Sequence, residues 1–125
     1  IVTGVQTCAL PIFGGVDNLT LIAAAADDDT IYLAELKDNL ISKVYYGKTS
    51  QDTSTWKSIE LNTPCYKEEL FVSGNGKIYQ HDSLKGVIKD INSGTQTTYH
   101  GKFIQLYDKG VVSLVNNTVS FTPFK

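Results

Sequence analysis

The sequence predicts an all-β fold of antiparallel strands, and three observations support this prediction. Ten Gly, seven Tyr and no Met among 125 residues favour β structure. Short apolar runs, several with alternating side chains, recur along the chain and are separated by polar turns. Some of these turns carry Asn-Gly or Asp-x-Gly, which supply the positive φ angles that tight hairpins require.

The composition excludes several classes of protein. With 42% hydrophobic and 19% charged residues, the chain is typical of one globular domain or a piece of one. Its net charge is −2 and all eleven basic residues are Lys, which excludes the usual basic nucleic-acid binder. No apolar run is long enough for a transmembrane helix, and no charged segment precedes an apolar core as in a signal peptide.

The first twelve residues differ from the rest of the chain. Residues 2–12 resemble the in-frame translation of a common sequencing adapter, and they carry no charged side chain. We therefore predict that residues 1–12 are not native, that the gene was assembled from metagenomic reads, and that residues 13–125 are a fragment. The alternative is a short apolar edge strand, in which Cys8 could pair with Cys65. Without Cys8, no internal disulfide is available.

Three hairpins share one pattern, in which an apolar strand, a polar turn and a second apolar strand follow one another. They are predicted at Leu19–Leu33, Leu70–Tyr79 and Phe103–Leu114. Their turn centres are 47 and 34 residues apart. Further strands are predicted at Lys43–Thr49, Trp56–Leu61, Gly86–Ile91, Thr95–Tyr99 and Thr118–Phe124.

Each repeat therefore holds about four short strands, and this strand count and period are typical of a β-propeller blade. We predict four-stranded antiparallel meander blades at about 19–61 and 66–100, and an incomplete blade at 101–125. Together they would form an incomplete β-propeller of about 2.5 blades.

A helix is the competing interpretation for residues 30–44. Helix-like spacing is shared by Leu33, Leu36, Leu40 and Val44. Asp29 could cap the first turn. The pair Asp38-Asn39 can equally form the turn of a hairpin. Agreement with the other two repeats favours strands.

Residues 49–56 resemble the Asp-box, a turn motif of BNR-type propellers with the pattern Ser-x-Asp-x-Gly-x-Thr-Trp. Thr55 and Trp56 match this pattern, and Thr49 stands in the Ser position. In the motif, the Asp side chain braces a tight turn and the Trp packs between sheets. The resemblance implies a structural brace and marks no active site.

The Asp-box resemblance is degenerate at two positions. Gln51 occupies the Asp position, with Asp52 one residue later, and Thr53 replaces the Gly. We therefore assign the structural turn to Thr49, Asp52, Thr55 and Trp56.

Sialidases are Asp-box propellers, so the resemblance also implies a comparison with the sialidase catalytic site. A sialidase site uses three Arg residues, a Tyr/Glu nucleophile pair and an acid/base Asp. The chain has no Arg, and Tyr66 with Glu68 and Glu69 is more simply a polar start to a strand. We assign no catalytic residue and no cofactor.

Two other patterns have simple structural explanations. Gly47-Lys48-Thr49 resembles the end of a phosphate-binding loop, but Ser42 stands where that motif needs Gly, so we expect the end of a strand. His81 and His100 are too few for a metal site, and we expect both to be exposed loop residues.

Two groups could still bind ligands. Residues 27–29 are three successive Asp, which could hold a cation such as Ca²⁺ but more often form a solvated turn. Six tyrosines are candidate sugar-stacking platforms, although at least half should be ordinary sheet residues. They are Tyr45, Tyr46, Tyr66, Tyr79, Tyr99 and Tyr107.

These observations predict a non-enzymatic recognition or scaffold module that belongs to a larger β-propeller protein. The expected partner is an unknown protein or glycan, together with the missing blades. Fold-level analogy favours a cell surface or a phage particle as its location. The alternative is a fragment of a sialidase-like glycoside hydrolase whose catalytic residues lie outside this chain.

Overall fold

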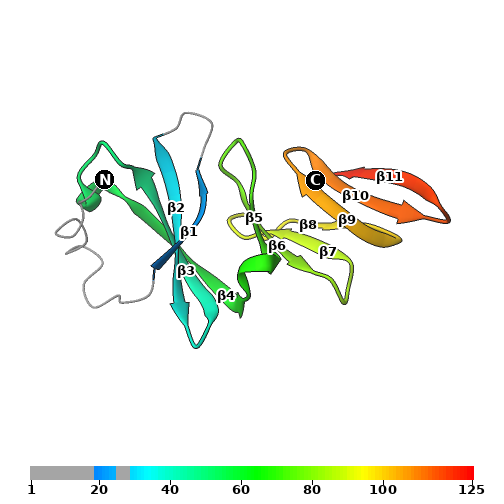
Figure 1. Cartoon of the computed structure of the whole chain (residues 1–125), viewed down its shortest axis with the longest axis horizontal. Coiled ribbons are helices and arrows are strands. Elements are labelled where there is room, and N and C mark those ends of the chain that lie inside the picture. Colours follow the sequence, from blue (N-terminus) through cyan, green and yellow to red (C-terminus); the bar gives the residue numbers. More distant parts are fainter. Residues whose placement is uncertain (1–18, 25–28) are drawn as a thin grey trace. The chain divides into compact units, whose positions relative to one another are not determined.

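The computed structural model describes residues 19–24 and 29–125, and these residues form an all-β protein with three antiparallel sheets (Figure 1). The predicted all-β class is confirmed. The predicted adapter segment, Cys8, Asp27 and Asp28 lie outside the described residues. The chain divides into two units with a boundary between Pro64 and Cys65, and each unit is described by itself.

The first sheet is a meander of four strands in chain order. It contains β1 (Leu19–Ala24), β2 (Thr30–Lys37), β3 (Leu40–Lys48) and β4 (Lys57–Cys65). A short 3₁₀ helix, η3 (Thr53–Thr55), lies between β3 and β4. Among the described strands, β2, β3 and β4 are the longest, with eight, nine and nine residues. β2 pairs with β3 along their full lengths.

The turn between β2 and β3 decides between the helix and the hairpin for residues 30–44. Asp38 and Asn39 both have positive φ, at 54° and 66°, as a two-residue type I′ turn requires. Ala34, Ile41 and Val44 are fully buried, which places them on the inner faces of β2 and β3. The hairpin is therefore confirmed, and the helical alternative is wrong.

The second unit contains a four-stranded and a three-stranded meander, joined in sequence. The four-stranded sheet holds β5 (Leu70–Val72), β6 (Ile78–Asp82), β7 (Val87–Asp90) and β8 (Gln96–Thr98), and a 3₁₀ helix, η4 (Lys67–Glu69), precedes it. The three-stranded sheet holds β9 (Lys102–Tyr107), β10 (Gly110–Val115) and β11 (Thr118–Pro123).

Asn116 and Asn117 form the turn between β10 and β11. Their φ angles are 50° and 63°, so this is a second type I′ hairpin turn. Asn tolerates this left-handed conformation better than most residues because its short side chain can form local hydrogen bonds. The Asn-Asn pair therefore specifies the register of the last hairpin, in which Val115 pairs with Thr118.

The two sheets of the second unit pack on each other through one apolar core. The buried members come from both sheets, and three partly buried Phe side chains surround them. The core consists of Tyr79, Ile88, Tyr99, Leu106 and Val111, flanked by Phe71, Phe103 and Phe124. Phe124, next to the last residue, stacks on Tyr79 with ring centroids 4.1 Å apart, so the C-terminal residues help to hold the sheets together.

Polar contacts also connect these two sheets. The Gly74 N–H in the β5–β6 turn donates to the Asp108 carboxylate in the β9–β10 turn, at 2.8 Å. A Cβ atom at Gly74 would lie 2.8 Å from that carboxylate, so the close approach requires glycine. The Lys125 N–H donates to the Thr97 hydroxyl at 2.9 Å.

Candidate functional site

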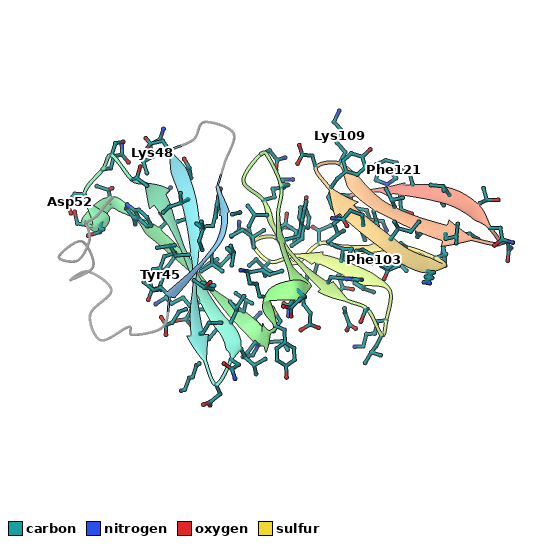
Figure 2. The ribbon with its side chains drawn as sticks, viewed as in Figure 1. Tyr45, Lys48, Asp52, Phe103, Lys109 and Phe121 are labelled. Atoms are coloured by element: carbon teal, nitrogen blue, oxygen red, sulfur yellow. The ribbon has the colours of Figure 1, made fainter. Side chains whose placement is uncertain are left out.

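The four residues of the predicted Asp-box-like turn lie in one loop between β3 and β4. Figure 2 labels Asp52 in this loop. Each makes at least one hydrogen bond within the loop or to a neighbouring residue, so the loop has a hydrogen-bonded structure. The loop is mostly exposed: Thr49, Asp52 and Thr55 are exposed, and Trp56 is half-buried.

Asp52 braces the turn by capping η3. Its carboxylate accepts the Ser54 N–H at 3.0 Å, and its carbonyl accepts the Thr55 N–H at 2.9 Å. The Thr55 hydroxyl donates to the same carbonyl at 2.7 Å. Asp is a favoured N-cap residue because its carboxylate satisfies an N–H that has no partner within the helix. Asp52, one residue later than in the motif, thus accepts a backbone N–H within the turn.

Trp56 closes the loop against the end of β3. Its indole N–H donates to the Lys48 carbonyl at 3.1 Å. The ring lies directly over Gly47, where an added Cβ would be only 2.4 Å from the indole Cγ. The Trp56 ring therefore packs directly on the Gly47 backbone. The Gly47-Lys48-Thr49 sequence ends a strand, as predicted.

Asp29 connects this loop to the start of β2, a contact that the sequence analysis did not predict. Its carboxylate accepts the Thr49 hydroxyl at 2.6 Å, the Ser50 hydroxyl at 2.7 Å and the Ser50 N–H at 3.3 Å. These hydrogen bonds, first from Thr49 and then from Ser50, lower the pKa of Asp29 below its usual range. The last Asp of the acidic run thus has a bracing role.

Hydrogen bonds hold the two carboxylates of this loop in place. Its carboxylates Asp29 and Asp52 accept hydrogen bonds from neighbouring hydroxyl and N–H groups of the loop. In the part of the chain that the structure describes, no three His, Cys, Asp or Glu residues come together as a possible metal site.

His81 contradicts the prediction of an exposed loop histidine. It lies on β6, is only 8% exposed, and its Nε2 is 2.7 Å from the Tyr99 hydroxyl. Its ring also packs on Phe103, with centroids 4.3 Å apart. Burial lowers the pKa of His81, against smaller opposite effects of Asp82 and Glu69. The sequence could not show this, because a strand position reveals its buried face only when the sheets pack. His100 is exposed and lies outside the strands, as predicted.

The tyrosines divide into buried and exposed groups. Tyr45, Tyr79 and Tyr99 are less than 9% exposed and are therefore not sugar-stacking platforms. Tyr45 donates to the Glu35 carboxylate at 2.9 Å, and burial together with this bond raises its pKa to about 12. Tyr46 is half-buried and stacks on Tyr32, with centroids 5.6 Å apart.

Tyr66 and Tyr107 remain exposed, at 56% and 47%. The Tyr66 N–H donates to the Glu69 carboxylate at 2.9 Å, and the Glu69 N–H donates back to the Tyr66 carbonyl at the same distance. This reciprocal pair shapes the turn before β5. It gives Tyr66 and Glu69 the structural role expected for the start of a strand.

Cys65 carries a free and buried thiol at the end of β4. Burial, with a smaller contribution from the charge of Glu69, raises its pKa to about 12. The thiol is therefore protonated at neutral pH and a poor nucleophile.

Among residues 19–24 and 29–125, no helix has the length and hydrophobicity needed to cross a membrane. Comparison with known proteins gave no match to any family model, curated protein or solved structure.

Proposed function

We propose that this chain is a non-enzymatic recognition or scaffold module, built from β-propeller-type repeats and belonging to a larger protein. Its ligand would be a protein or a glycan. The observation that carries the proposal is the packing of two successive meanders on one core in the second unit. Stacking of neighbouring repeats, each of which buries the apolar face of the next, is how repeat architectures obtain a continuous core.

A constant offset supports the repeat interpretation. The β5–β8 and β9–β11 sheets align when 33 is added to each residue number, so that Ile78 corresponds to Val111. Ile78 is the first residue of β6 and Val111 is the second residue of β10, and both are at most 1% exposed. The first sheet has the same strand order and a braced turn before its last strand.

The braced turn supports a structural role for the loop between β3 and β4. The bonds of Asp29, Asp52 and Trp56 hold its backbone in place. Such a loop can present exposed side chains to a partner without a large loss of conformational entropy.

Two experiments test the proposal. Long-read sequencing through both ends of this reading frame should reveal further repeats of about 35–45 residues. The longer protein should then be assayed with a fluorogenic sialoside and on an array of immobilised glycans. A binding module is supported if the sialoside is not hydrolysed and aromatic and amide side chains cluster at one end of the repeats. Hydrolysis of the sialoside, with clustered Arg and carboxylates, would establish the glycoside hydrolase instead.

A further inference from the structure

The turn between β5 and β6 contains Asn75-Gly76, the one place in the sequence where Gly follows Asn. Asn75 is exposed to solvent, and Gly76 has a positive φ of 85°. Besides forming a turn, such a pair can react with itself. Gly carries no side chain, so its backbone nitrogen can approach the preceding carboxamide closely.

Two hydrogen-bond donors meet at the Asn75 carboxamide oxygen. The Ser73 hydroxyl donates to it, and the Lys77 N–H donates to it at 3.3 Å. The Lys77 bond closes a ring that contains Gly76, and this ring folds the carboxamide back across Gly76. Donors aimed at an oxygen stabilise the negative charge that develops there when the attached carbon is attacked. The turn therefore polarises the carboxamide for attack by the Gly76 nitrogen.

The donor arrangement is held by the fold. Ser73 is only 3% exposed, and its N–H donates to the Lys77 carbonyl at 2.9 Å. Its hydroxyl also accepts the Lys77 N–H at 3.2 Å. The Ser73 hydroxyl is therefore fixed beside Asn75 in the folded chain.

We propose that Asn75 is a self-modification site, at which loss of the carboxamide nitrogen loosens the turn from Asp108. The Gly76 nitrogen bonds to the Asn75 Cγ as the Cγ–Nδ2 bond breaks. The Gly76 amide proton passes through solvent to the departing ammonia, and a succinimide ring remains. Water then opens the ring at Cγ to give aspartate, or at the main-chain carbonyl to give isoaspartate. This inference is independent of the proposed recognition role.

One hydrogen bond opposes the reaction. The Gly76 N–H donates to the Ser73 carbonyl at 2.9 Å, and this bond must break before the nitrogen can attack. Exposed turns open locally at a lower free energy than the core of a protein. The rate of modification in the folded chain is therefore set in part by opening of this turn.

The modification changes a contact between the two sheets of the second unit. The Gly74 N–H donates to the Asp108 carboxylate of the β9–β10 turn at 2.8 Å. Isoaspartate lengthens the main chain of the β5–β6 turn by one carbon, which is incompatible with the present pairing of Ser73 and Lys77. Both products also add a negative charge next to Gly74, and like charges repel. We therefore expect the modified turn to move away from Asp108.

Incubation of the folded full-length chain in mildly alkaline buffer tests the reaction. Peptide mapping by mass spectrometry follows each Asn separately, and enzymatic methylation detects isoaspartate. Asn92 is the internal control, because it is also exposed but is followed by Ser93. Asn75 should convert at least about tenfold faster than Asn92, because the Ser side chain obstructs the attacking nitrogen. After conversion, the Gly74 amide should exchange its hydrogen with solvent faster than before.

Replacing Ser73 tests the role of the hydroxyl. S73A should slow the conversion of Asn75 severalfold in the folded chain and leave its rate in concentrated urea unchanged, because the hydroxyl is aligned only by the fold. N75Q keeps an amide at this position and should acquire no acidic form there. Four results would each overturn the proposal. They are equal folded-state rates at Asn75 and Asn92, conversion of Asn75 only in urea, undiminished conversion in folded S73A, and a Gly74 amide that stays protected after conversion.

Discussion

Replacing Ile88 by Ala tests the sheet-on-sheet core on which the proposed function depends. Ile88 is 1% exposed and lies among the aromatic and aliphatic side chains of both sheets in the second unit. Its truncation removes three buried carbons and leaves a cavity. Substitutions of this kind lower the free energy of unfolding by about 2–5 kcal/mol. For a unit of this size, the midpoint of thermal unfolding should fall by about 8 °C or more.

The matched control is the same substitution at Ile104, which is 46% exposed in the same unit. I104A should change the free energy of unfolding by less than about 1 kcal/mol, because less than the full side chain is transferred out of water. Urea denaturation followed by circular dichroism measures both variants, at a concentration where the chain is monomeric. If I88A proves as mild as I104A, the two sheets do not share the core described here.

Three further predictions concern single residues. Burial lowers the pKa of His81 in the folded chain, so on acidification the unfolded chain binds a proton at a higher pH than the folded chain does. The free energy of unfolding should therefore fall as the pH decreases from about 6.5. H81F should flatten this decline in urea midpoints measured from pH 7.5 to 5. D52A removes the acceptor for the Ser54 N–H and should cost about 1 kcal/mol in the same assay. The buried hydroxyl of Ser113 has no hydrogen-bond partner among the described residues, so S113A should raise the free energy of unfolding by about 1 kcal/mol.

Each of these predictions has a control of similar chemistry. H100F alters an exposed His and should leave the acid-induced decline unchanged. D52N keeps an oxygen acceptor and should cost less than D52A. Ser120 lies opposite Ser113 in the register of β10 and β11, and its hydroxyl is partly exposed. S120A should therefore stabilise the chain less than S113A. A steeper pH dependence in H81F, equal costs for both Asp52 variants, or a destabilised S113A would contradict the respective reasoning.

Local turn chemistry made the hairpins predictable from the sequence alone. The Asp38-Asn39 pair supplies the two positive φ angles of its turn, and the strands on either side follow from β-branched and aromatic residues. The loop between β3 and β4 was also predicted, since Asp52, Thr55 and Trp56 are close in sequence and their bonds are mostly local. Short-range interactions of this kind depend little on the rest of the fold.

Only the tertiary structure decided which residues are buried and which distant residues meet. Asp29 bonds Thr49 and Ser50 across 20 and 21 positions, so no local pattern could identify the contact. His81 is buried, whereas Phe121 is exposed, although both lie on strands with similar alternation. An alternating strand shows that it has two faces, but the face that is removed from water is set by the sheet that packs on it.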